Sequence, residues 1–252
     1  MIAQWITASL IFFILDIRLI SFYGLLGDQN LPWGGSYLIT LLAVIVITNS
    51  LNLIDGIDGL ASVFSLIATL FFGTWFYFIA NYQYAILCYA LSGGILAFLF
   101  QNWEPSKIFM GDTGSLVIGT LLAILAIQFV NQNFKLENLN PYKFNSSIGT
   151  AICVLILPLV DTSRIIIIRL YKKISPLTAD KRHIHHALVR LNFTHRQAVY
   201  ILTIVHVSII SIALLMKKTP EWLLLGVIFV IVIALCILLD RFILKALDKE
   251  TL

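Results

Sequence analysis

LLAVIVITNSLNLIDGIDGLASVFSLIATLFF, residues 41–72, contains two apolar runs separated by a short polar segment. Each run continues beyond the quoted stretch and approaches the ~20 residues that a helix needs to cross the hydrocarbon core of a membrane. The segment between them holds two asparagines, two aspartates and two glycines. We therefore predict two membrane-spanning helices joined by a polar turn.

The chain as a whole has the composition of a membrane protein. Of its 252 residues, 60% are hydrophobic and 12% are charged, whereas a soluble domain is about half apolar and about a quarter charged. We predict an all-α, polytopic integral membrane helix bundle that forms one domain over residues 1–252. About eight transmembrane helices are expected, over residues 2–20, 37–54, 60–80, 84–101, 114–130, 147–168, 198–216 and 222–243.

Other compositional features narrow the class further. The three cysteines lie within apolar runs, without the spacing of a metal site or of a disulfide framework. The net charge of +4 suits a protein beside anionic lipid or an anionic substrate. No nucleic-acid-binding motif is evident, and we expect no nucleic-acid partner.

The distribution of basic residues predicts the orientation in the membrane. Seven Lys or Arg residues lie in the loop at residues 169–197, and loops rich in these residues face the cytoplasm. By alternation, the loops at residues 55–59 and 102–113 are cytoplasmic as well. We therefore expect the chemically useful polar loops to share one membrane face.

Polar residues recur at every third position of NSLNLIDGIDGLA (residues 49–61), namely Asn49, Asn52, Asp55 and Asp58. On an α-helix this spacing forms a polar arc, whereas in a 3₁₀ turn the four side chains would eclipse one another. An aspartate here could simply cap the next helix. Capping leaves the two asparagines unexplained, and polar groups in a membrane span usually line a functional cavity. We therefore predict a functional site.

A second polar motif, FMGDTGSLVIG (residues 109–119), precedes another apolar run and places Asp112 between two glycines. Asp112 could cap the helix that starts near Ser115. Glycines also let backbone N–H groups approach a phosphate at a helix N-terminus, and a carboxylate oxygen there can bind Mg²⁺. The two interpretations are compatible.

The loop SPLTADKRHIHHAL (residues 175–188) collects His183, His185 and His186 beside Lys181 and Arg182. A zinc site is one alternative, but no cysteine or Glu-x-x-His pattern accompanies the histidines, and the neighbouring cations disfavour a further cation. A second alternative is a solvated basic loop whose only role is to set the membrane topology. Donors from imidazole, ammonium and guanidinium groups suit a diphosphate better, so we predict anion binding.

A fourth motif, LPLVDTSRIIIIRL (residues 157–170), places Asp161 and Arg164 one helical turn apart. The two side chains could form a structural ion pair or contact a substrate, and Pro158 could kink the span. His206 lies alone in the seventh predicted span, where we expect a packed core residue. His195 is expected at the surface of a loop.

Together these motifs predict a membrane transferase or hydrolase that acts on a phosphorylated substrate at the cytoplasmic surface. Carboxylates, amides and a cationic histidine loop suit a Mg²⁺-bound diphosphate, and an apolar groove beside them would suit a lipid. A non-enzymatic membrane protein, such as a permease or an assembly subunit, is the alternative. Transporters often contain internal repeats, and none is evident in this sequence.

In these four motifs, and in DIRLISFYGLLG (residues 16–27), the chain resembles the polyprenyl-phosphate N-acetylhexosamine-1-phosphate transferases. The bacterial undecaprenyl-phosphate N-acetylglucosamine-1-phosphate branch is the most similar. This resemblance implies transfer of N-acetylhexosamine 1-phosphate, with GlcNAc as the first candidate sugar, from a UDP-sugar to undecaprenyl phosphate. UMP would be released at the cytoplasmic face of a bacterial inner membrane, and a lipid-linked cell-surface glycan would begin with this step.

The resemblance also implies roles for individual residues and partners. Asp55, Asp58 and Asp112 would be catalytic, with Asp112 as a ligand of Mg²⁺ or Mn²⁺. The partners would be the polyprenyl phosphate lipid, the UDP-N-acetylhexosamine and the membrane, with a homodimer as a further candidate. The substrate-binding residues would be Asn49, Asn52, Arg164, Lys181, Arg182, His183, His185 and His186.

The family also has an earlier Asp-Asp motif that follows its N-terminal spans, and no Asp-Asp pair occurs in this chain. The resemblance therefore covers the C-terminal two-thirds of the family fold and implies that the N-terminal third is missing. The paired aspartates are thought to position the lipid phosphate. We therefore expect activity to require a segment that carries them.

Overall fold

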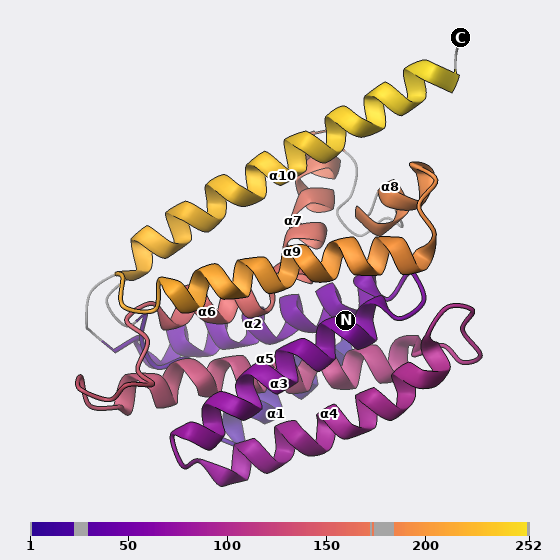
Figure 1. Cartoon of the computed structure of the whole chain (residues 1–252). Coiled ribbons are helices and arrows are strands. Elements are labelled where there is room, and N and C mark those ends of the chain that lie inside the picture. Colours follow the sequence, from indigo (N-terminus) through magenta and orange to yellow (C-terminus); the bar gives the residue numbers. More distant parts are fainter. Residues whose placement is uncertain (1, 23–29, 172, 174–183, 251–252) are drawn as a thin grey trace.

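The computed structural model describes residues 2–22, 30–171, 173 and 184–250, and helices are the only extended regular elements of these residues. The all-helical membrane fold predicted from composition is confirmed. Figure 1 shows the long helices packed side by side, with α7 inclined steeply to its neighbours. The helices are α1 (Ile2–Phe13), α2 (Trp33–Ile54), α3 (Leu60–Phe78), α4 (Tyr82–Asn102), α5 (Gly111–Lys135), α6 (Ser147–Val154), α7 (Ile156–Tyr171), α8 (Ile184–Arg190), α9 (His195–Leu215) and α10 (Glu221–Glu250).

Within the described residues, six helices are long and apolar enough to cross a membrane, namely α2, α3, α4, α5, α9 and α10. They match six of the predicted spans, and most helix ends lie within a few residues of the predicted ends. The bent pair α6 and α7 makes a seventh crossing if it is counted as one span. The expected total of eight is therefore not confirmed.

The predicted first span, residues 2–20, forms only the 12-residue helix α1. A helix of that length is about 18 Å long, which is short of the ~30 Å hydrocarbon core. The chain turns away at Asp16, whose φ is 48°. The backbone of Leu19 then bonds to α2, donating to the Thr40 hydroxyl (2.9 Å) and accepting from Ser36 Oγ (2.6 Å). Side chains of α2 thus replace the helical hydrogen bonds that the chain gives up.

The predicted span at residues 147–168 is a broken helix, in which α6 and α7 meet at Leu155 with a bend of 81°. The kink anticipated from Pro158 is confirmed. A proline cannot donate to the carbonyl four residues before it, and its ring clashes with that carbonyl, here the carbonyl of Val154. The break therefore falls just before the proline.

A close approach between α2 and α5 sets the spacing of the polar motifs. Gly119 permits this approach, because a Cβ atom at that position would lie 2.9 Å from Thr48 Cα and 3.1 Å from the Thr48 carbonyl oxygen. The hydroxyls of Thr48 and Thr120 lie 3.3 Å apart at the same level. One turn further along α2 is Asn52, and α5 begins two turns before Gly119.

The polar loops gather at one end of the bundle. Figure 1 shows the α2–α3 turn, the α4–α5 loop and α8 at the same end, opposite the α3–α4 and α9–α10 turns. The convergence predicted from the loop positions is therefore confirmed for the described parts of these loops. The assignment of this end to the cytoplasm stays a prediction.

Replacing Gly119 with alanine is expected to separate α2 from α5, because the new methyl group would overlap backbone atoms of Thr48. Overpacking of this kind costs about 1–3 kcal/mol. We expect a lower midpoint of thermal unfolding for the detergent-solubilised variant. The matched control is Gly226→Ala in α10, where nothing lies within 4 Å of the added Cβ. Equal midpoints for the two variants would contradict the close contact.

Candidate active site

Asn52, in the last turn of α2, joins the two acidic motifs. Its Nδ2 donates to Asp112 Oδ1 (3.0 Å) and to Ser115 Oγ (2.8 Å), both in the first turns of α5. Ser115 in turn donates to the carbonyl of Gly111 (3.0 Å). The motifs at residues 49–61 and 109–119 therefore form a single polar cluster.

Asp55 directly follows α2 and lies close enough to Asp112 for their charges to interact. Burial is the main cause that raises the pKa of Asp55, and the charge of Asp112 raises it further, while a hydrogen bond from the Gly111 N–H opposes both effects. Two carboxylates in one partly buried place repel each other when both are ionised. A bound cation would relieve that repulsion.

Asp58 connects three segments at this end of the bundle. It accepts hydrogen bonds from Ser106 Oγ (2.8 Å) and the Ser106 N–H (3.3 Å), and its Oδ2 lies 3.6 Å from His195 Nδ1. Nearby, the Arg196 N–H donates to Glu104 Oε2 (2.7 Å). The expectation that His195 belongs to a loop is therefore wrong, because His195 begins α9 and faces the acidic turn.

Asn102, the last residue of α4, is buried and joins the α2–α3 turn to the α4–α5 loop. Sequence reasoning missed this residue. Its buried Oδ1 accepts from the Gly59 N–H (3.1 Å) and from Ser62 Oγ (2.9 Å), and its Nδ2 donates to the Ile108 carbonyl (3.0 Å). Gly59 has φ 79°, a conformation that favours glycine. The only sign of its role in the sequence was that a polar residue ends an apolar run.

Asn49, one turn before Asn52, is directed toward α1. Its side-chain amide exchanges two hydrogen bonds with that of Gln4 (3.0 and 3.2 Å) and donates to the Ile45 carbonyl (2.8 Å). These bonds explain an asparagine in an apolar span by joining α1 to α2. The structure does not bring Asn49 into the cluster of Asn52 and Asp112, and its substrate contact stays a prediction.

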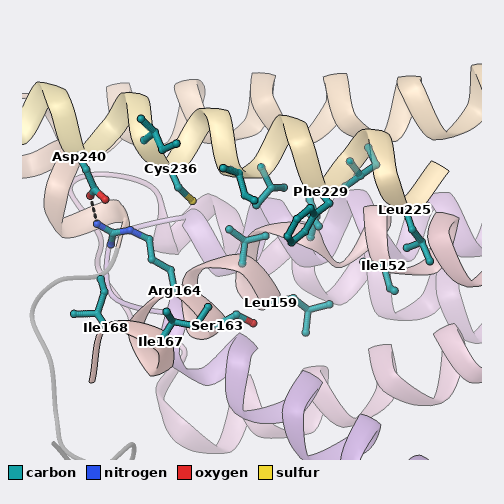
Figure 2. Close-up of a pocket in the computed structure, with 16 residues that line it drawn as sticks. Ile152, Leu159, Ser163, Arg164, Ile167, Ile168, Leu225, Phe229, Cys236 and Asp240 are labelled. Carbon is teal, nitrogen blue, oxygen red and sulfur yellow. Dashed lines mark hydrogen bonds and ion pairs between the residues drawn. The ribbon is translucent and has the colours of Figure 1, made fainter. Parts of the chain in front are cut away.

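On α7, Asp161 and Arg164 contact different helices. The buried Asp161 accepts a hydrogen bond from the N–H of Ile184 at the start of α8 (2.8 Å). Arg164 forms an ion pair with Asp240 of α10, which Figure 2 shows. The orientation of α7 therefore affects both α8 and α10.

The basic and histidine loop is only partly described. Lys181, Arg182 and His183 lie outside the described residues, whereas His185 and His186 belong to α8. Anion binding by these five residues stays a prediction. The start of α8 is nevertheless fixed beside α7 by the bond between Asp161 and Ile184.

An apolar groove of about 560 Å³ runs between α7 and α10 (Figure 2). Isoleucine, leucine and valine side chains and Phe229 line it, and the pair of Arg164 and Asp240 lies at one end. Asp161, one turn from Arg164, lines a small gap together with Ile54, the residue before Asp55. The α7 segment that carries Arg164 therefore passes beside the end of α2.

Among the residues that the structure describes, no group of three His, Cys, Asp or Glu side chains is arranged to hold a metal ion. The cluster does offer the carboxylates of Asp55 and Asp112, with the amide of Asn52 and the hydroxyl of Ser115 beside them. Mg²⁺ usually takes one or two carboxylates and completes its shell with water and substrate phosphate. The donor set therefore fits Mg²⁺ bound together with a phosphorylated ligand.

Fold and site together define a multi-pass membrane protein with an acidic, oxygen-rich cluster at one end of its helix bundle. A sequence profile of glycosyl transferase family 4 matches residues 1–130, just over half of the 252 residues. The chain belongs to this family.

Named relatives extend the match along the chain. A probable undecaprenyl-phosphate N-acetylglucosaminyl 1-phosphate transferase of Bacillus subtilis is 34% identical over 220 residues, which cover 81% of this chain and 55% of the relative. The undecaprenyl-phosphate alpha-N-acetylglucosaminyl 1-phosphate transferase of Escherichia coli K12 is 33% identical over 201 residues, which cover 77% and 52%. The chain spans about half the length of the curated relatives it matches.

Replacing Asp112 with asparagine is expected to lower the pKa of Asp55, because a like charge is removed. Burial, the larger cause, remains, so the pKa should stay above its ordinary value. Asp55 would then ionise at a lower pH than in the native protein. Infrared spectra of ¹³C-aspartate-labelled protein, differenced against the matching Asp55→Asn variant, would follow this titration.

The control for this titration is Asp58→Asn, which removes a carboxylate that is not a cause of the Asp55 shift. It should leave the titration of Asp55 in place. An unchanged titration in Asp112→Asn would contradict the interaction between Asp55 and Asp112.

Replacing Asn102 with leucine is expected to destabilise this end of the bundle, because the Gly59 N–H and the Ile108 carbonyl lose their partner. Each unpaired buried group costs roughly 1–3 kcal/mol. We expect a lower unfolding midpoint and faster proteolysis within residues 103–110. The control is Asn138→Leu, an exposed residue of the α5–α6 loop. Indistinguishable proteolysis in the two variants would refute the anchoring role of Asn102.

Proposed function

We propose that this chain carries part of the active site of an enzyme that transfers N-acetylhexosamine 1-phosphate from a UDP-sugar to undecaprenyl phosphate. GlcNAc is the proposed sugar, since the relatives are named as N-acetylglucosaminyl 1-phosphate transferases. The reaction would occur at the cytoplasmic face of a bacterial inner membrane, and its product would begin a cell-surface glycan.

One observation carries the proposal, namely the joining of Asn52 and Asp55 to Asp112 at the end of the bundle. The negative charge of Asp112 disfavours ionisation of Asp55. Their oxygens, together with those of Asn52 and Ser115, suit Mg²⁺ better than a softer metal. Such a site favours a ligand that arrives as a magnesium complex, as nucleotide diphosphates do.

Magnesium bound at Asp112 and Asp55 would neutralise charge that develops on the transferring phosphate. Asn52 would fix the direction of the Asp112 carboxylate through its 3.0 Å hydrogen bond. The Asp58 carboxylate, held by Ser106, would keep the α2–α3 turn against the α4–α5 loop. The predicted donors of the histidine loop would bind the diphosphate.

The apolar groove between α7 and α10 supports a lipid acceptor. A polyprenyl chain is apolar along its length and carries a phosphate at one end, which matches a groove with Arg164 at one end. A phosphate there would compete with Asp240 for the guanidinium group, which prefers bidentate oxyanions.

In the proposed reaction, an oxygen of the lipid phosphate attacks the β-phosphorus of the UDP-sugar. The bond between that phosphorus and the oxygen bridging to the α-phosphate breaks, and UMP leaves with the electron pair. The sugar keeps its bond to the β-phosphate. The product is a polyprenyl diphospho-sugar.

The direct experiment measures this transfer in membranes that contain the chain. Because the chain spans about half of its relatives' length, it is co-expressed with the N-terminal segment of the Bacillus subtilis relative. Radiolabelled UDP-GlcNAc and undecaprenyl phosphate are supplied with Mg²⁺. We expect labelled lipid and an equal amount of UMP, and loss of Asp112 ligation in Asp112→Asn should lower the rate by about 100-fold or more.

The matched control is Glu137→Gln, an exposed carboxylate at the opposite end of the bundle, which should leave the rate unchanged. Full activity of Asp112→Asn would contradict the metal assignment. Binding of UDP-GlcNAc without any lipid product, with the segment present, would favour a non-enzymatic role instead.

A further inference from the structure

The break between α6 and α7 leaves a backbone carbonyl without its helical partner. In a continuous helix the carbonyl of Val154 would accept from the N–H of residue 158, and Pro158 has no such group. An unpaired carbonyl in an apolar interior is costly, so another donor is expected there.

His206 of α9 supplies that donor. Its side chain is fully buried, and its Nε2 lies 2.9 Å from the Val154 oxygen. Because a carbonyl oxygen only accepts, Nε2 must carry the proton. Nδ1 is buried without a hydrogen-bond partner among the described residues, which is consistent with a neutral ring protonated at Nε2. The imidazole also stacks on Phe64 of α3 at 4.9 Å.

The direction of α7 beyond this break determines where several polar groups lie. Asp161 accepts from the Ile184 N–H and so holds the start of α8, to which His185 and His186 belong. Arg164 pairs with Asp240 at the end of the apolar groove. A change of the bend at Leu155 would move all these contacts relative to Asp55 and Asp112, which belong to the α2–α5 pair.

We propose that His206 is a positioning residue for the transfer reaction. By donating to the Val154 carbonyl, it fixes the bend between α6 and α7, and thereby sets where Asp161, Arg164 and α8 lie relative to the acidic cluster. The consequence for catalysis rests on the proposed function. The consequence for the direction of α7 can be measured without any activity.

A packing role and a positioning role make opposite predictions for two substitutions. His206→Phe keeps a ring of similar size against Phe64 but has no donor. His206→Gln loses the ring but keeps an N–H at a place close to that of Nε2. If packing matters, phenylalanine is the better substitute, and if the N–H matters, glutamine is the better substitute.

The direction of α7 is measured by electron–electron double resonance between spin labels at Tyr171 and Leu215, whose side chains are 89% and 86% exposed. The three cysteines, Cys88, Cys153 and Cys236, are first replaced by alanine. Tyr171 ends α7 about 22 Å from its start, so a 20° change of the bend would move it by about 8 Å. The measurement is made on the chain of residues 1–252 reconstituted in lipid nanodiscs.

We expect His206→Phe to shift the main distance by several ångströms and His206→Gln to keep it. An unchanged distance in His206→Phe would overturn the proposal, and so would equal shifts in both variants. Pro158→Ala provides a third test, because alanine restores an N–H that can reach the Val154 carbonyl. The double variant Pro158→Ala/His206→Phe should then differ little from Pro158→Ala alone, whereas independent shifts of the two substitutions would count against the proposed bond.

The catalytic consequence is measured with UDP-GlcNAc and undecaprenyl phosphate, in membranes that also contain the N-terminal segment. Misplacement of binding groups by about 1 Å can slow a reaction by about 100-fold, so we expect kcat to fall at least about tenfold in His206→Phe. His206→Gln should remain within about threefold of the native chain, and KM for UDP-GlcNAc should be little affected in both.

Equal kcat values for His206→Phe and the native chain would overturn the catalytic part of the proposal. Absence of activity in the native chain with its segment would instead count against the proposed function. In that case the distance measurements still decide whether His206 sets the direction of α7.

Discussion

The contact between α2 and α5 at Gly119 is the constraint on which the rest of the site depends. Without a side chain at this position, the backbone of α5 lies against Thr48, and one turn further Asn52 reaches both Asp112 and Ser115. Small residues let membrane helices approach closely, and polar side chains then bond across the interface. The two motifs therefore share one cluster because the helices that carry them can touch.

A second constraint is that backbone groups in an apolar environment need partners. The described helices break in several places, and at some of these a side chain from elsewhere in the chain supplies the partner. Ser36 and Thr40 serve the segment after α1, and His206 serves the break before Pro158. The carboxylate of Glu221 accepts from two N–H groups at the start of α6, at 2.8 and 2.9 Å. These polar residues in apolar spans are structural supports for irregular backbone that leads to the site.

The charged side chains at the polar end of the bundle differ in the partners that they contact. Burial raises the pKa of Asp55, the hydrogen bond from the Gly111 N–H lowers it, and the negative charge of Asp112 raises it. Asp58 is engaged by Ser106 and His195, and Arg164 by Asp240. The contacts of Asp58 and of Arg164 hold segments of the chain together. The approach of Asp55 to Asp112 instead brings two negative charges close to each other. That difference supports the proposal that a cation with a phosphorylated ligand binds at Asp55 and Asp112.

The sequence by itself determined the all-helical membrane fold, six of the spans, the kink near Pro158 and the gathering of the polar loops. Hydrophobic runs and residue spacing are local properties, so they can be read without knowing which helices touch. Tertiary structure alone decided that Asn52 bonds to Asp112 while Asn49 turns to Gln4, that α1 is too short to span the membrane, and that His206 supports a broken helix. The contacts of Asn102 with Gly59 and of His195 with Asp58 went unrecognised for the same reason, because each joins residues more than 40 positions apart in the chain that only helix packing brings together.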